Sequence, residues 1–359
     1  MNKKILKQVT GMLVAGTMVF GLTGCAGASK DSASSSDAET EESTAIAETA
    51  DVDTAADLKT LRIGVGGVDG GGILEGAALA VKNKYFEEEL EKVGYQPEYI
   101  YFSGAGPEIN EALAGDQIDA AIVGDFPTFT AKSNGIDTTI IAETNQKVNY
   151  GILTTVENAE TIEDLKGKTA VVFGGSVSQF FWMNYLEKKG IDIDEIPYVN
   201  STDATTLLNS GDAQVYPVTA YMAYYLESMG IGHVIDTADA DIWTTFVFEV
   251  KSDLLKENDQ LGVAINKALI RASKEAQENP QSQYDALASE TVSAEAWEKY
   301  YAADPTLSNL SPEITEEIIA YYEKENQWML DNGVISNPVD ISTFVDTSYY
   351  ERALQELEQ

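Results

Sequence analysis

The stretch YFSGAGPEINEALAGDQIDAAIVGDFPTF, residues 101–129, decides the fold class. It contains the end of an apolar strand, a helix with Pro107 suited to its first turn, a Gly-Asp turn and a second, buried strand. Strands and helices alternate in the same way on both sides of it, from Leu58 to about Val250. This alternation is the pattern of a mostly parallel sheet with helices on both faces, so the sequence predicts an α/β fold.

The alternation begins again after Val148, which predicts two similar lobes. The segment EALAGDQIDAAIVGD (111–125) is echoed by TLLNSGDAQVYPVTA (206–220), because each reads as helix, Gly-Asp turn and buried strand. We therefore expect lobe 1 over residues 58–147, lobe 2 over 148–244, and a return to lobe 1 followed by a helical C-terminal extension over 245–359. Pro217 lies inside the second of these strands and predicts an edge strand or an interrupted one.

The N-terminal segment has the pattern of an export signal. Three lysines precede the apolar run GMLVAGTMVFGL (11–22), which is too short to span a bilayer of about 30 Å as a helix. Leu22-Thr23-Gly24-Cys25 follows and resembles the lipobox of bacterial lipoproteins, in which the cysteine receives a lipid. We expect a signal peptide over 1–24 and lipidation at Cys25, the only cysteine. An acidic tether would follow over 25–57, holding the protein on the outer face of the cytoplasmic membrane.

The composition argues against several classes of function. The formal charge of −36 repels nucleic acid and anionic lipid, and no basic stripe is present. His233 is the only histidine and Cys25 is assigned to the lipid, so neither a catalytic triad nor a histidine or thiolate metal site can be assembled. We expect no cofactor, no metal and no enzymatic activity. An adhesin would have no need for the two matched glycine loops described next.

A glycine-rich loop follows the first strand, in LRIGVGGVDGGGILEG (61–76). Read as a dinucleotide fingerprint from Gly64, it has Asp69 where the third glycine belongs, and a P-loop would need Lys and Ser or Thr after Gly72. Both nucleotide patterns fail. The remaining interpretation is a loop whose bare glycine backbone lets a ligand come close. The segment FGGSVSQ (173–179) is its counterpart in lobe 2, and together the two loops predict opposite walls of a ligand cleft.

The chain resembles the solute-binding proteins of ABC importers of the aliphatic-sulfonate, taurine and nitrate type. The resemblance covers about residues 58–279 and includes LRIGVGG, the opening stretch, ETIEDLKGKTAVVFGGSVSQFFWMNYLEKKG and LGVAINKALIRASKEAQENP. It implies two lobes that close on a small solute around a hinge, without chemistry, and then present it to a membrane permease with its ATPase. We expect the protein to be a monomer.

The resemblance also implies a set of ligand-binding residues. In lobe 1 these are Gly67, Asp69, Gly70, Gly71, Ser103, Gly104, Gly124, Asp125, Phe126 and Asn145. In lobe 2 they are Gly175, Ser176, Ser178, Tyr216 and Thr219, to which we add Trp243.

The charge of the ligand is left open by the sequence. Arg62 is the only arginine before Arg271 and lies inside the first strand, so an anion would depend on backbone N–H groups, hydroxyls or Lys147. Acids and aromatic residues could equally frame a cationic or heteroaromatic ligand, such as a thiamine-pyrimidine precursor. The acids are Asp69 and Asp125, and the aromatic residues are Phe126, Phe180, Trp182, Tyr216 and Trp243.

Overall fold

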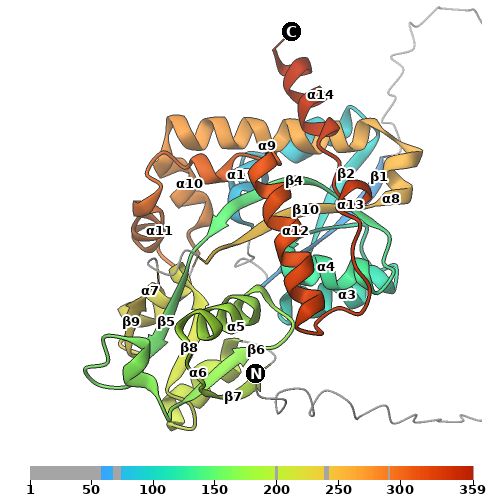
Figure 1. Cartoon of the computed structure of the whole chain (residues 1–359). Coiled ribbons are helices and arrows are strands. Elements are labelled where there is room, and N and C mark those ends of the chain that lie inside the picture. The colour runs from blue at the N-terminus through green and yellow to red at the C-terminus, as the bar shows by residue number, and fades with distance from the viewer. Residues whose placement is uncertain (1–57, 68–73, 199–200, 238–241, 290–291, 359) are drawn as a thin grey trace, which may run out of the picture. The chain divides into compact units, whose positions relative to one another are not determined.

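The chain forms two five-stranded sheets, which we call sheet A and sheet B (Figure 1). The computed structural model describes residues 58–67, 74–198, 201–237, 242–289 and 292–358, all within one compact unit. In spatial order, sheet A contains β2 (Tyr95–Phe102), β1 (Lys59–Gly66), β3 (Ala120–Gly124), β10 (Thr244–Lys251) and β4 (Thr138–Val148). Sheet B contains β7 (Asp194–Tyr198), β6 (Thr169–Phe173), β8 (Val215–Thr219), β5 (Tyr150–Thr154) and β9 (His233–Asp236).

Each sheet is mixed, with four strands running one way and one running the other. In sheet A, β10 pairs antiparallel with both β3 and β4, whereas β1 pairs parallel with β2 and β3. In sheet B, β5 pairs antiparallel with β8 and β9, whereas β6 pairs parallel with β7 and β8. The α/β class is therefore confirmed, and the reversed strands β5 and β10 are the ones that follow the two crossings between the sheets.

The chain crosses from sheet A to sheet B at Asn149, which separates β4 from β5, and it returns between β9 and β10. The two crossings lie against each other, because the Tyr150 hydroxyl and Thr244 Oγ1 are 2.8 Å apart in a hydrogen bond. Two adjacent connections therefore join the two lobes.

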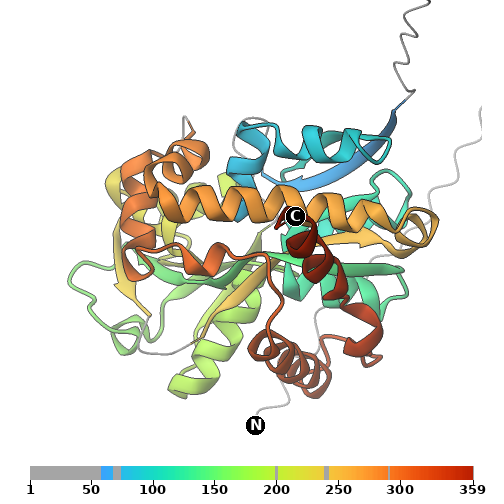
Figure 2. The same cartoon turned by 90° about the horizontal axis from the view of Figure 1, so that it is seen from above.

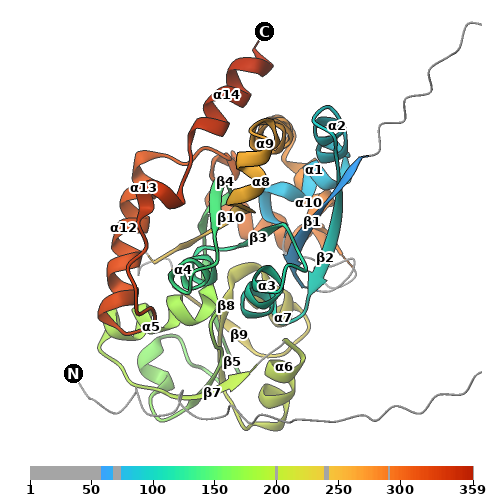
Figure 3. The ribbon, with the colours of Figure 1, turned by 90° about the vertical axis from the view of Figure 1, so that its right-hand side faces the viewer.

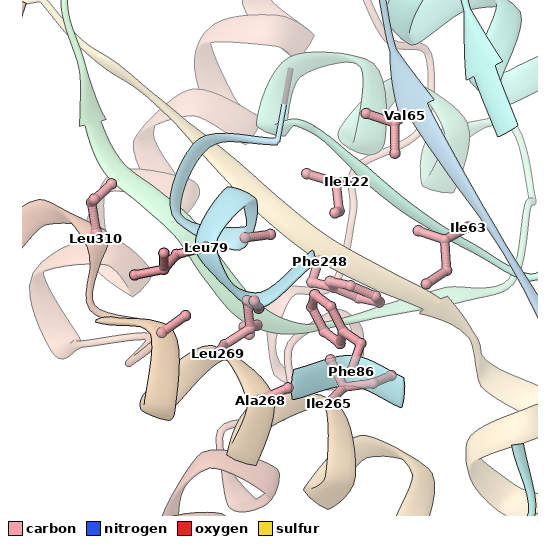
Figure 4. Packing of buried hydrophobic residues seen from close by; sticks show 14 of the residues in the cluster. Ile63, Val65, Leu79, Phe86, Ile122, Phe248, Ile265, Ala268, Leu269 and Leu310 are labelled. Carbon is pink, nitrogen blue, oxygen red and sulfur yellow. The ribbon is translucent and has the colours of Figure 1, made fainter. Parts of the chain in front are cut away.

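Helices cover both faces of sheet A (Figure 3). They are α1 (Ala78–Lys82), α2 (Tyr85–Glu91), α3 (Ala105–Ala114), α4 (Asp125–Ser133), α8 (Ser252–Glu257) and α9 (Gln260–Glu278). Helix α9 packs with α1 and α2 on one face, and α3 and α4 pack on the other. On the α9 face, Phe86 meets Phe248 and Ile265 in a core that excludes water (Figure 4).

The segment GILEGAALAVKNKYFEEEL (72–90), which reads as one helix, is broken in the structure. A 3₁₀ turn, η2 (Glu75–Ala77), leads into α1, and α1 ends before Asn83. Lys84 then adopts a left-handed conformation with φ of 61°. The apolar spacing continues through the break, so the sequence does not reveal it. The break turns α2 so that it packs against α9.

Strand β8 lies inside sheet B, so an edge position for Pro217 is wrong. The pairing of β8 with β6 is nevertheless short, since it consists of Ala170 opposite Val215. Pro217 lies opposite Ile152 of β5. A proline is tolerated here because the ladder on the β6 side has already ended. Strand β8 itself runs without a break from Val215 to Thr219, so the alternative of an interrupted strand is wrong as well.

Helices of lobe 2 and of the C-terminal extension complete the structure. Lobe 2 contains α5 (Val177–Lys189), α6 (Ser201–Ser210), α7 (Ala220–Ser228) and the 3₁₀ helix η3 (Ile162–Leu165). The extension contains α10 (Pro280–Leu287), α11 (Ala294–Tyr300), α12 (Glu316–Asp331), α13 (Ile341–Phe344), α14 (Ser348–Leu357) and the 3₁₀ helices η5 (Tyr301–Ala303) and η6 (Ser308–Leu310).

The extension touches both lobes. Helix α14 packs on α9 (Figure 2). Gly262 of α9 admits the Tyr349 ring there, since a Cβ at Gly262 would lie 2.5 Å from that ring. Helix α11 packs on α7 of lobe 2. Trp328 of α12 meets Phe180 of α5 edge-on, with ring centroids 5.1 Å apart.

Candidate ligand-binding cavity

A cavity of about 790 Å³ lies where the two lobes and the extension meet. Its walls include the carboxyl ends of β1, β3 and β6 and the first residues of α3, α5 and α7. In open α/β sheets, ligands bind at the carboxyl ends of the strands, and this volume is in the range of small-molecule sites. The cavity is therefore the candidate functional site.

Two glycines allow the lobes to touch beside the cavity. A Cβ at Gly124, the last residue of β3, would lie 2.2 Å from Val177 Cγ1 at the start of α5. A Cβ at Gly175, whose φ is 74°, would lie 3.1 Å from Pro107 Cγ in α3. Real Cβ atoms do not approach a neighbour as closely as 2.2 Å. The bare backbone at Gly124 is thus required by the closeness of the lobes.

Seven of the residues expected from the sequence line the cavity. They are Gly67, Ser103, Gly124, Ser176, Ser178, Tyr216 and Thr219. Ser176 and Thr219 precede the first turns of α5 and α7, so the N–H groups of two helix ends lie at the cavity wall. Such ends attract anions or electronegative atoms. The Ser176 hydroxyl already donates to the Phe173 carbonyl at 2.7 Å, which leaves its oxygen free to accept.

Six other expected residues lie outside the lining: Gly104, Asp125, Phe126, Asn145, Gly175 and Trp243. The Gly104 N–H donates a hydrogen bond to Glu108 Oε2 at 2.7 Å, and Gly175 lies against Pro107 of α3 in the contact between the lobes. Phe126 packs on Phe180, and Trp243 stacks on Tyr321 with centroids 4.2 Å apart. Four more, Cys25, Asp69, Gly70 and Gly71, lie outside the described residues.

Asp125 is turned into the protein instead of toward the cavity. Its carboxylate is fully buried and accepts hydrogen bonds from the Thr245 N–H at 2.7 Å and the Tyr321 hydroxyl at 3.1 Å. Burial raises the pKa of Asp125 to about 7, and burial also raises the pKa values of the nearby Glu143 and Glu325. This carboxyl therefore ties the first turn of α4 to β10 and α12.

The sequence reading missed Glu75, which lines the cavity and is fully buried. Burial is the main cause that raises the pKa of Glu75 to about 7, while hydrogen bonds from Asn145 and Tyr301 lower it in part. Asn145, expected to touch the ligand, lies outside the lining and donates from its Nδ2 to Glu75 Oε2 at 3.0 Å. Nothing in the local sequence distinguishes Glu75 from the other glutamates of its helical segment.

The reading also missed most of the aromatic wall. Tyr101, Tyr221, Tyr225, Phe173 and Trp297 line the cavity together with Tyr216. Trp297 belongs to the C-terminal extension, far from the strand ends on which the sequence argument depended. Among the described residues, the lining contains two carboxyl groups, those of Glu75 and Asp203, and no Lys, Arg or His. The internal segments outside the described residues also contain none of these three residue types.

Two searches of the described residues gave negative results. No helix in the described ranges is long and apolar enough to cross a membrane. Within the same ranges, His, Cys, Asp and Glu side chains do not gather in a group of three or more suited to a metal ion.

Known proteins resemble this chain in sequence and in fold. The NMT1/THI5-like family pattern matches residues 76–283. A Bacillus subtilis (strain 168) protein, named as a candidate aliphatic sulfonates-binding protein, is 20% identical over 307 residues, which is 83% of this chain and 89% of that protein.

Solved structures share the fold of this chain. One from Methylobacillus flagellatus KT, named as a candidate periplasmic sulfonate-binding protein of an ABC transporter, has a TM-score of 0.69 at 24% identity, covering 84% of this chain and 96% of that one. The desulfurization enzyme DSZB has a TM-score of 0.61 at 16% identity, covering 83% of this chain and 99% of that one. The fold is thus shared by binding proteins and an enzyme. The chain belongs to the NMT1/THI5-like family, with the fold of periplasmic sulfonate-binding proteins.

Proposed function

We propose that the protein is the extracytoplasmic solute-binding component of an ABC importer. It holds a small organic solute in the cavity between its lobes and delivers it to a permease that works with an ATPase. The observation that carries this proposal is the cavity itself, whose wall combines two helix N-termini from lobe 2, strand ends from lobe 1 and aromatic side chains. The sulfonate-binding names of the relatives point to the same role.

We propose binding without catalysis, although the fold also occurs in an enzyme. The single histidine, His233, is absent from the cavity lining, and its Nε2 lies 2.7 Å from the Ala159 carbonyl oxygen. The single cysteine lies in the N-terminal segment. Nucleophilic catalysis of the Ser–His or Cys–His kind needs partners that these positions do not supply.

Two classes of ligand fit different parts of the cavity. A sulfonate or similar anion would be held by the N–H groups at the starts of α5 and α7 with the hydroxyls of Ser176, Ser178 and Thr219. A cationic or heteroaromatic solute would be held by the carboxyl groups and the aromatic wall. The absence of Lys, Arg and His from the described lining favours the second class for at least part of the ligand.

The lipobox adds a location to this proposal. Lipid on Cys25 would hold the protein at the outer face of the cytoplasmic membrane, and the segment 26–57 would give it reach toward the permease. We propose that the protein works there as a monomer.

The proposal is tested by looking for the solute. The purified protein is analysed by native mass spectrometry for a retained small molecule, and its thermal unfolding is followed with and without an extract of small metabolites. A ligand bound by the folded state alone raises the unfolding temperature, because it increases the free energy of unfolding. At a ligand concentration a hundredfold above Kd this increase is about 2.7 kcal/mol. The variant Thr219→Val, which removes a hydroxyl from the lining at nearly constant shape, should weaken the effect. If neither a retained solute nor a temperature shift is found with any fraction, the binding role is wrong.

A further inference from the structure

Glu75 is a residue of the cavity wall that has an unused hydrogen-bonding position. Its Oε2 accepts a hydrogen bond from Asn145 Nδ2 at 3.0 Å, and the Tyr301 hydroxyl lies 3.5 Å from the same oxygen. Its Oε1 finds no partner among the described residues, although the side chain is fully buried. A buried polar group left without a partner costs about 1–3 kcal/mol, so this position suits a donor that arrives with the ligand.

The structure holds Glu75 firmly in place. Gln283 Nε2 of α10 donates to the Glu75 carbonyl oxygen at 2.9 Å. The next residue must be glycine, because a Cβ at Gly76 would lie 2.3 Å from the Thr144 carbonyl oxygen of β4. Glu75 itself has a φ of 44°, a left-handed conformation that L side chains rarely adopt. Backbone strain maintained by its surroundings is characteristic of binding sites with a fixed geometry.

The surroundings of Glu75 are aromatic and lack positive charge. Tyr221, Tyr300 and Tyr301 are the titratable side chains around it, from α7, α11 and η5. Neither an ion pair nor a hydrogen bond joins Glu75 to a lysine or arginine of the described chain. A carboxylate beside aromatic rings attracts a cation by charge and by cation–π contact.

We infer that Glu75 recognises a protonated nitrogen, so that the solute is an amine-bearing molecule with an aromatic or apolar body. The ammonium group donates to Glu75 Oε1, and the body of the molecule packs between the tyrosines and Trp297. This inference rests on the proposed function, because it names the chemistry of the solute in the same cavity. The inference is independent of the cavity wall formed by the N-termini of α5 and α7, which could hold an anionic group of the same molecule.

The test uses probes that share one ring and differ in charge: benzylammonium, benzyl alcohol and benzenesulfonate. Dissociation constants are measured by calorimetry at about pH 8 for the wild type, Glu75→Gln and Glu249→Gln. Glu249 is the matched control, because it is also a fully buried glutamate but does not line the cavity. We expect the wild type and Glu249→Gln to bind benzylammonium at least about tenfold more tightly than benzyl alcohol, and Glu75→Gln to lose this difference.

A second measurement needs only the wild type, in case Glu75→Gln does not fold. Lowering the pH through about 7 protonates Glu75, whereas burial keeps the pKa values of the three tyrosines above their ordinary value, so they stay neutral throughout. Benzylammonium affinity should then fall by up to about tenfold per pH unit, while benzyl alcohol affinity stays constant.

The inference is overturned if the wild type does not bind benzylammonium, shows no preference for it over the alcohol, or loses none of that preference at low pH. A preference that persists in Glu75→Gln also overturns it. The proposed function survives each of these results as long as benzenesulfonate or a solute from the metabolite extract stabilises the protein. The proposed function is wrong only if no solute stabilises the protein.

Discussion

The rings of Tyr221 and Trp297 stack with their centroids 4.2 Å apart and their planes at 29°. Tyr221 belongs to α7 of lobe 2, and Trp297 belongs to α11 of the C-terminal extension. Both line the cavity, and the Trp297 Nε1–H donates to the Leu287 carbonyl at 3.0 Å. The extension therefore forms part of the cavity wall and packs there against lobe 2.

Removing the Trp297 ring should reduce both stability and ligand affinity. Trp297→Ala empties a buried site, which costs about 3–5 kcal/mol in free energy of unfolding for a large aromatic residue. The comparison is Trp328→Ala, because Trp328 also joins the extension to lobe 2 but does not line the cavity. Urea unfolding and calorimetric binding are measured for both. Equal loss of affinity in the two variants would show that Trp297 acts through lobe bridging and not as part of the wall.

A methyl group at Gly124 should keep the lobes apart. In Gly124→Ala the new Cβ meets Val177 Cγ1, and overpacking of this kind costs about 1–3 kcal/mol. Because the clash lies between the lobes, we expect ligand affinity to fall by about tenfold or more. Gly174→Ala is the control, since a Cβ there has no neighbour within 4 Å. The double variant Gly124→Ala/Val177→Ala should recover affinity, and failure to do so would rule out this steric explanation.

Stability should fall as the pH rises from about 4.5 to about 7. Burial raises the pKa of Glu249 from its ordinary value near 4.5 to about 7. Between these values the unfolded chain has lost the proton while the folded protein keeps it, so raising the pH favours unfolding. Above about 7 the loss from this group is complete, and it is on the order of 3 kcal/mol.

The variant Glu249→Gln removes this titration and should flatten the fall in stability. It is measured by urea unfolding at several pH values between about 4.5 and 8, with Glu98→Gln at an exposed position of β2 as the control. Both oxygens of Glu249 lack hydrogen-bond partners among the described residues, so the neutral amide should also be more stable than the wild type at about pH 8. An unchanged slope in Glu249→Gln would contradict the assignment.

Lipidation at Cys25 predicts the location of the protein in the cell. Wild-type protein should sediment with membranes and enter the detergent phase of a two-phase partition, because the lipid adds about 0.8 kcal/mol per buried methylene. Cys25→Ser should instead appear in the aqueous phase, with the unfolding temperature of the folded unit unchanged. If the two proteins partition alike, Cys25 carries no anchor.

Much of the fold could be predicted because strand and helix patterns are local. The buried strand at β3 and the glycine at its end appear in the sequence as an apolar run that follows a Gly-Asp turn. The helix α4 after it could not be recognised in the same way. The break at Lys84 could not be predicted in the same way, because the apolar spacing of α1 continues into α2. The turn between them is set by contact of α2 with α9, whose residues lie far along the chain.

The candidate site shows the same division. Ser176 could be predicted because the segment 173–179 follows an apolar strand and opens a helix, and the ends of parallel strands gather at one edge of a sheet. Thr219 was implied by the family resemblance. Neither Glu75 nor Trp297 could be predicted as a cavity residue. Glu75 occupies an ordinary helical segment, and Trp297 belongs to an extension without any motif. Their roles depend on which elements pack around them.

The sequence by itself determined the alternation of strands and helices that gives the α/β class, and the glycine-rich segment before α5, because these depend on residues adjacent in the chain. The tertiary structure alone decided which carboxyl group lines the cavity. Asp125 directly follows the buried strand β3, yet it turns inward to the Thr245 N–H. Glu75 lines the cavity because β4, α10 and η5 hold it there. The direction of a buried charge is set by the hydrogen-bond donors around it, and only the fold brings those donors together.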